Sequence, residues 1–177
     1  RFIARFGRVA WRRGLVADEI ERYTSIGVAA GKAHGDFYAG VSFTIAALLQ
    51  SPNFVYQVEL GLPDPRNIKL RKLDGYELAA RMSFFLLDTT PSPELLDQAE
   101  AGALDTGEGV REAARGLLAL PAARGALRGY YDEVFRLRDL ASVAKDAGTY
   151  PAFNAELAAA MREETLLLID EIVWDEG

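Results

Sequence analysis

The chain of 177 residues contains no cysteine and a single histidine. Without cysteine, these residues form no disulfide, no thiolate metal site, no catalytic cysteine and no haem attachment of the Cys-x-x-Cys-His type. The single histidine argues against a di-iron carboxylate bundle, which usually takes a Glu-x-x-His motif from each of two helices. The lack of cysteine leaves the compartment open, because a cysteine-free domain suits the periplasm as well as the cytosol.

Long apolar runs and recognisable catalytic signatures are also missing. The richest apolar stretch, residues 158–173, is interrupted by five charged residues, so no segment is a candidate membrane span. The chain has no Gly-x-Ser-x-Gly, Walker or dinucleotide-binding motif. Because it opens at Arg1 without an initiator methionine and ends just after a predicted helix, we expect an internal segment or a processed product of a longer protein.

Charge is unevenly distributed along the chain, whose net charge is −6. Residues 1–60 hold 7 basic and 5 acidic groups, and residues 61–177 hold 13 and 21, which gives +2 and −8. The N-terminal excess forms a basic stripe on one predicted helix, made of Arg1, Arg5, Arg8 and Arg12. Such a stripe can bind nucleic acid or anionic lipid. We favour a solvated face that pairs with acidic neighbours, and the acidic overall charge argues further against nucleic acid.

Apolar residues recur at helical spacing along the whole chain. Besides an N-terminal helix, this spacing predicts helices over residues 17–30, 37–50, 52–58, 74–87, 94–101, 109–120, 122–135 and 152–174. Residues 68–73 are compatible with a short extended piece, but no two-residue alternation predicts a larger sheet. We therefore predict an all-α fold of about eight helices in two closely packed helical subdomains, without a substantial sheet. The inner stripe predicted for the last helix consists of Leu157, Met161, Leu168 and Ile172.

The segment from residue 73 to residue 102 carries the clearest local signals. Asp74 is a candidate N-cap, and Glu77 three residues later can return a hydrogen bond to the cap's own N–H. Glu77 and Arg81 stand four apart with the acid first, which predicts an ion pair that is partly buried and organises a helix junction. After a proline-marked turn, Ser92 is the predicted N-cap of a second helix, which should end at Gly102.

The same segment resembles a known family. LDGYELAARMSFFLLDTTPSPELLDQAEAGAL, residues 73–104, is similar to the signature block of domain-of-unknown-function family fifteen ninety-two, and residues 136–173 are similar to its second half. FGRVAWRRGLVADEIERY, residues 6–23, and GVSFTIAALLQSPNFVYQVELG, residues 40–61, resemble the small companion domain that normally precedes it. The resemblance is therefore collinear over nearly the whole chain.

This chain also departs from the family pattern. Gly14 stands where the family usually has proline, and Leu87 and Val134 stand where it usually has tryptophan. The smaller side chains predict locally repacked helix contacts. The family has no established catalytic group that these departures would remove.

The resemblance implies a domain organisation and a setting. It implies a companion domain over residues 1–62, a linker over 63–72 and the family domain over 73–177, incomplete at its C-terminal end. The family occurs in large exported proteins of planctomycetes and myxobacteria, often beside a c-type cytochrome domain. The resemblance thus implies a periplasmic or cell-envelope location, with flanking domains, protein subunits or a c-type cytochrome as partners. It implies no cofactor within this chain, whereas haem c can belong to a flanking domain or partner.

Two polar features are weak candidates for chemistry. His34, in a glycine-flanked loop, could be a haem ligand or a general base, but an exposed histidine explains it better. Asp105-Thr106-Gly107 has the letters of the aspartic-protease triplet, but it stands in a glycine-rich turn before a helix, without flanking apolar strands. We therefore assign no catalytic role to either.

Acidic and aromatic rows near the C-terminal end are further candidates. The seven-residue repeat of Glu156, Glu163 and Asp170, with the parallel row of Glu164 and Glu171, could hold Ca²⁺ or Mg²⁺ if another helix supplied oxygens. A solvated acidic face is the ordinary interpretation. A second set of side chains could line a ligand groove or a partner site, although core packing is the preferred explanation. This set consists of Tyr130, Tyr131, Phe135 and Trp174.

The sequence leaves two classes of function. The first is a non-catalytic helical scaffold or docking module of an exported multidomain protein associated with a c-type cytochrome and electron transfer. The second is part of an extracytoplasmic oxidoreductase or hydrolase whose active site lies mainly outside this chain. Whether the protein is an enzyme stays open, because no residue here demands catalysis. We predict no catalytic, cofactor-binding or metal-binding residue.

Overall fold

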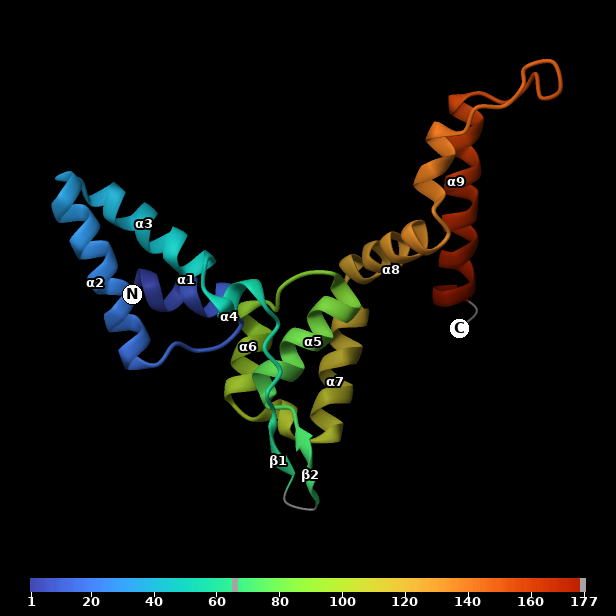
Figure 1. The fold of residues 1–177 in the computed structure, drawn as a ribbon. Helices are drawn as coiled ribbons and strands as arrows, with labels where there is room; N and C mark the ends of the chain where they lie inside the picture. Colours follow the sequence, from blue (N-terminus) through green and yellow to red (C-terminus); the bar gives the residue numbers. More distant parts are fainter. Residues whose placement is uncertain (65–66, 176–177) are drawn as a thin grey trace. The chain divides into compact units, whose positions relative to one another are not determined.

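The computed structural model describes residues 1–64 and 67–175, and these residues form two compact units. Unit 1 comprises residues 1–85 and 89–115, and unit 2 comprises residues 86–88 together with the described residues from Gly116 onward. The described residues form nine α-helices and a π-helical turn, together with one two-stranded sheet, so the fold is mainly helical as predicted (Figure 1). None of these helices is long and apolar enough to cross a membrane.

Four helices open unit 1. They are α1 (Phe2–Trp11), α2 (Ala17–His34), α3 (Phe37–Leu49) and α4 (Pro52–Val55). Asp36 caps α3 by accepting hydrogen bonds from the N–H groups of Tyr38 and Ala39, and Ser51 caps α4 through the N–H of Asn53. The Asp36 cap lies at the reversal of the chain between α2 and α3, which run side by side as a hairpin (Figure 1).

Glycines allow α2 and α3 to approach closely. A Cβ added at Gly40 would lie 2.5 Å from the carbonyl oxygen of Gly27 and 3.3 Å from the Cα of Gly31. Since both neighbours are backbone atoms, they cannot move aside as a flexible side chain would. The hydroxyl of Thr44, buried in the same contact, donates to the carbonyl of Gly40 at 2.9 Å.

The second half of unit 1 contains three further helical elements before its last helix. They are α5 (Gly75–Leu87), α6 (Pro93–Glu100) and the 3₁₀ turn η1 (Ala103–Asp105), followed by α7 (Gly107–Leu118). The predicted capping of α5 is confirmed, because Asp74 N–H donates to Glu77 Oε2 and Glu77 N–H donates to Asp74 Oδ1, both at 2.8 Å. Ser92 caps α6 as predicted, and Gly102 follows that helix with a φ of 75°.

A two-stranded hairpin lies between the two halves of unit 1. Strand β1 (Leu62–Asp64) pairs antiparallel with β2 (Asn67–Lys72), with Leu62 opposite Lys72. It occupies most of the span predicted to be a linker, and the extended piece predicted over residues 68–73 falls on β2. A short hairpin of this kind gains little stability by itself. The residues just before the hairpin, Leu60 and Gly61, are held by Glu77 of α5 and by Arg71 of β2, as described below.

Unit 2 is organised around one buried carboxylate. Its elements are α8 (Pro121–Val134), the 3₁₀ helix η2 (Leu137–Ser142), α9 (Ala155–Asp170) and the π-helical turn η3 (Glu171–Asp175). Asp132 on α8 is buried, and it accepts hydrogen bonds from Arg162 Nε at 2.6 Å and from Arg138 Nε at 2.6 Å. These two hydrogen bonds hold the pKa of the Asp132 carboxyl well below its usual range, although burial acts in the opposite direction.

The predicted inner stripe of α9 is wrong. The residues of α9 that are buried are Ala158 and Leu166, whereas Leu157, Met161 and Leu168 are exposed. Ile172, in the following π-helical turn, is exposed as well. The rotation of α9 follows from Arg162, whose bond to Asp132 turns that side of the helix toward α8. The predicted stripe therefore faces outward.

Candidate functional site

A cavity of about 430 Å³ in unit 1 lies next to a cluster of charged side chains. It lies where the end of α1, the segment after α4, the hairpin and the start of α5 come together. Six charged side chains line it, namely Arg12, Arg13, Glu59, Arg71, Asp74 and Glu77. What this site can do depends on whether these groups are free or already bound within the fold.

Arg12 binds the end of α4 from inside the protein. It follows the last residue of α1 in a left-handed conformation with φ 59°, and only 8% of the residue is exposed. Its Nη2 donates to the carbonyl oxygens of Asn53 at 2.7 Å and Tyr56 at 2.9 Å. Free carbonyls at a helix C-terminus attract a cation, so Arg12 closes α4. Burial lowers the pKa of the Arg12 guanidinium, which stays charged because its ordinary pKa is so high.

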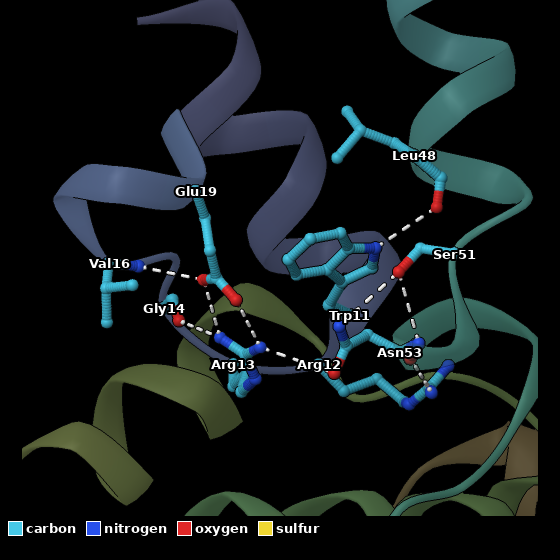
Figure 2. Close-up of polar contacts among 9 residues, drawn as sticks. All are labelled: Trp11, Arg12, Arg13, Gly14, Val16, Glu19, Leu48, Ser51 and Asn53. Atoms are coloured by element: carbon cyan, nitrogen blue, oxygen red, sulfur yellow. Dashed lines mark hydrogen bonds and ion pairs between the residues drawn. The ribbon is translucent and has the colours of Figure 1, made fainter. Parts of the chain in front are cut away.

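Arg13 points the other way, toward the start of α2. Its two terminal nitrogens donate to the two carboxylate oxygens of Glu19 at 2.9 and 2.8 Å (Figure 2). Glu19 Oε2 also accepts from the N–H of Val16 at 3.0 Å, which caps α2. The hydrogen bond between them raises the pKa of Arg13 and lowers the pKa of Glu19. The pair therefore fixes the turn between α1 and α2, beside the buried ring of Trp11.

Trp11 connects the same turn to the end of α3. Its indole Nε1 donates to the carbonyl oxygen of Leu48 at 3.1 Å (Figure 2). The Trp11 ring meets Tyr23 edge-on, with 5.3 Å between ring centroids. Adjacent residues Trp11, Arg12 and Arg13 thus bind α3, α4 and α2 in turn.

Glu77 and Arg71 hold the segment that leads into the hairpin, residues 57–61, which we call the junction segment. Glu77 Oε1 accepts from the N–H groups of Leu60 at 2.6 Å and Gly61 at 2.9 Å, in addition to its capping bond. Arg71 donates from Nη2 to the carbonyl oxygen of Gly61 at 2.7 Å and from Nε to that of Leu60. Burial raises the pKa of the Glu77 carboxyl, but these N–H groups lower it by more, so the net shift is downward.

The predicted ion pair between Glu77 and Arg81 is replaced by a different one. Arg81 donates instead to Glu59, from Nε at 3.0 Å and from Nη2 at 2.6 Å. The Arg81 side chain is 60% exposed, so the prediction of partial burial is also wrong for this residue. Glu77 therefore organises the junction without Arg81, because its carboxylate binds backbone N–H groups rather than a cation.

The charged side chains that line the cavity form their hydrogen bonds with other groups of the fold. Each of its six charged side chains is hydrogen-bonded to backbone or to an ion-pair partner. The pKa shifts of Arg13 and Glu77 favour the charged forms, whereas a general acid or base needs its pKa moved toward neutrality. The arrangement binds and orients polypeptide backbone.

The four arginines of the basic stripe predicted on the first helix have different environments in the structure. Arg8 pairs with Asp97 at 2.7 Å and Glu100 at 2.9 Å on α6, as the prediction of acidic neighbours requires. Burial lowers the pKa of Arg8, but the hydrogen bond and charge of Asp97 outweigh it and the pKa is raised. Arg1 and Arg5 are exposed. Arg12 is buried, so the prediction that it belongs to a solvated face is wrong.

The other polar candidates lie outside the cavity lining. His34 is exposed at the end of α2, where its ring stacks on Phe43 with 5.3 Å between centroids. Asp105 ends η1 and Gly107 begins α7, and Thr106 between them accepts from the N–H of Gly109 through its Oγ1 at 3.1 Å. Thr106 therefore acts as a helix cap.

The acidic rows of α9 meet a cation from α8. Arg128 pairs with Glu163, and its Nε lies 3.7 Å from Asp170. A positive charge between two carboxylates is the opposite of what a metal site requires. Within residues 1–64 and 67–175, no group of three or more potential ligands is placed to hold a metal ion.

The aromatic candidates are only partly packed. Tyr131 lies between Tyr130 and Phe135, with centroid distances of 5.2 and 5.5 Å. Tyr130 is 61% and Phe135 54% exposed, so the prediction that they belong to the core is wrong. Trp174 is half-buried, and the guanidinium of Arg124 lies over its ring at 5.3 Å.

Comparison with known protein families identifies the chain at the domain level. The family model described as PSD4, Protein of unknown function (DUF1592), matches residues 73–177, and the model described as PSD5, Protein of unknown function (DUF1595), matches residues 1–59. No curated protein and no solved structure matches the chain. The junction segment lies at the end of the DUF1595 match, and the hairpin lies between the two matches. Glu77 and Arg81, both within the DUF1592 match, bind the junction segment. The chain belongs to the DUF1592 family of proteins of unknown function, with a DUF1595 domain preceding.

Proposed function

We propose that this chain is a non-catalytic helical scaffold or docking module of an exported multidomain protein associated with a c-type cytochrome and electron transfer. The module is periplasmic or attached to the cell envelope. Its partners are flanking domains or protein subunits, among them the cytochrome. Haem belongs to such a partner and not to this chain.

One observation carries the scaffold role. All six charged side chains that line the cavity are bound to groups of unit 1 itself. Arg12, Arg71 and Glu77 bind backbone carbonyls and N–H groups, and Arg81 binds Glu59, so the residues matched by two families are joined through the junction segment. Charged groups that are bound within the fold in this way position the polypeptide chain, which is the task of a scaffold.

The test is isolation of the protein from its native source, followed by an intact mass and a visible absorption spectrum. The proposal predicts a mass well above the 19.4 kDa of this chain and a haem Soret band that stays with it through purification. A 19.4 kDa species without visible absorption would contradict the cytochrome association. A large species that lacks haem but contains a hydrolase domain would favour an enzymatic parent instead.

A further inference from the structure

The outward side of α9 carries an apolar stripe that its own unit leaves uncovered. Leu157 is 39%, Met161 41% and Leu168 55% exposed, and all three project from the side opposite the buried Leu166. Their spacings of four and seven residues keep them in one line along about three turns of helix. Such a line is the pattern that one helix presents to another. We call Leu157, Met161, Glu164, Leu168 and Glu171 the α9 outer face.

Acidic groups follow one edge of this stripe. An open hollow there is lined by Ala160, Glu163, Glu164, Leu167, Leu168 and Glu171. Glu163 is paired with Arg128, whereas in the described part of the chain no ion pair involves Glu164 or Glu171, both of which are exposed. The one basic residue of α9, Arg162, is turned away to Asp132. The stripe therefore has uncompensated negative charge beside it.

We propose that the α9 outer face docks an amphipathic helix whose apolar stripe is flanked by lysine or arginine. This inference rests on the proposed docking role and names its surface and the chemistry of its partner. The two leucines and the methionine bury apolar surface against the partner helix. Glu164 and Glu171 favour a partner that carries basic residues beside its apolar stripe.

The charge distribution sets this partner apart from two alternatives. A second copy would bring the same carboxylates together along a two-fold axis, and like charges across an interface are repulsive. An anionic lipid surface would meet the same repulsion, since such surfaces attract basic and not acidic helices. The exposed aromatic residues Phe37, Tyr38 and Phe43 of α3 have no comparable row of charge and so specify no partner chemistry.

The test uses the whole 177-residue chain and two designed peptides. Both carry leucine at the a and d positions of three heptads, with lysine at e and g in one peptide and glutamate at e and g in the other. Fluorescence anisotropy is expected to show that the lysine peptide binds at least about tenfold more tightly than the glutamate peptide. Leu168→Gln, which leaves the charge unchanged, is expected to weaken binding of the lysine peptide about tenfold, and Glu164→Gln about threefold.

Matched variants separate this site from general attraction to an acidic protein. Leu118→Gln changes an exposed leucine of α7, and Glu112→Gln removes an exposed carboxylate of α7. Both should leave the affinity within about twofold. Equal effects of the α7 and α9 variants, or no binding by the lysine peptide, would overturn the inference.

Two further measurements show whether a second copy of the chain or a lipid surface, rather than a basic helix, binds the α9 outer face. A dimer in sedimentation analysis that Leu168→Gln dissociates would replace the proposed helix by a second copy. Binding to vesicles of phosphatidylcholine and phosphatidylglycerol that requires Leu168 would replace it by a lipid surface. Each of these outcomes overturns the inference but leaves the mass and haem content of the native protein, and hence the proposed function, to be decided separately.

Discussion

Replacing Glu77 by glutamine tests the structural role of the cavity most sharply. The carboxylate accepts hydrogen bonds from the N–H groups of Leu60, Gly61 and Asp74, at distances between 2.6 and 3.1 Å. A glutamine amide keeps one oxygen and turns an NH₂ group toward donors, so at least one charge-assisted hydrogen bond is lost and one N–H group loses its acceptor. Such bonds contribute about 1.5–3 kcal/mol each. We expect Glu77→Gln to destabilise the protein by about 2–4 kcal/mol.

The assay is thermal unfolding followed by circular dichroism. For a domain of this size, about 3 kcal/mol corresponds to a fall in Tm of roughly 10 °C. Glu112→Gln is the matched control, because its carboxylate is 80% exposed and lies 3.8 Å from Arg115. An exposed pair contributes little, so the control should change stability by less than about 0.5 kcal/mol. Equal shifts for the two variants would refute the reasoning.

The pH dependence of the same variant gives a second check. The pKa of Glu77 is lowered in the folded protein, so its contribution is complete above the unfolded pKa and is lost as the pH falls through the folded pKa. The stability difference between the wild type and Glu77→Gln should therefore be constant above about pH 5 and shrink at lower pH. A difference that grows on acidification would show that the carboxylate is not stabilised in its charged form.

Three further predictions follow from other contacts. Arg12→Lys should cost about 2–3 kcal/mol in chemical denaturation, because one ammonium cannot reach the same set of carbonyls; wild-type stability would contradict this. Asp132→Asn should produce a clear fall in Tm and faster amide exchange in α8 and α9, because two arginines lose their carboxylate, and unchanged exchange would contradict it. Gly40→Ala should be destabilising because the new Cβ meets the backbone of Gly27, whereas Gly125→Ala, in open space in α8, should be stabilising by about 0.5–1 kcal/mol. Equal signs for the two alanine variants in thermal melts would contradict the packing argument.

Local signals in the sequence predicted the helix boundaries best. The capping pair of Asp74 and Glu77, the Ser92 cap and the glycine after α6 depend on residues within a few positions of one another, and the structure has all three. The family could also be recognised from the sequence, because the blocks that resemble it occur in the same order as the two matched domains. The hairpin was harder to predict, because β1 has only three residues and includes Pro63.

Long-range contacts account for the failures. The spacing of Leu157, Met161 and Leu168 predicts an apolar stripe but does not say which side of α9 is buried, and the bond from Arg162 to Asp132 decides it. Similarly, local spacing paired Glu77 with Arg81, whereas Arg81 is drawn to Glu59, 22 residues earlier.

Burial of Arg12 was not predictable from the stripe of arginines on α1. Its acceptors are carbonyl groups 41 and 44 residues further along the chain, and any residue type supplies such groups. The one available signal was its position at the end of a helix, directly after a tryptophan.

Amide hydrogen exchange at Leu60 and Gly61 tests most directly the claim that the charged cavity residues bind the junction segment. Both N–H groups lie in irregular backbone, and Glu77 is their acceptor. The account predicts that in the wild type they exchange far more slowly than free peptide amides, and that Glu77→Gln selectively removes this protection while Glu112→Gln leaves it intact. Exchange in the wild type at the rate of an unprotected peptide would contradict the account, because the segment would then be a free loop and the charged residues would be available for another purpose.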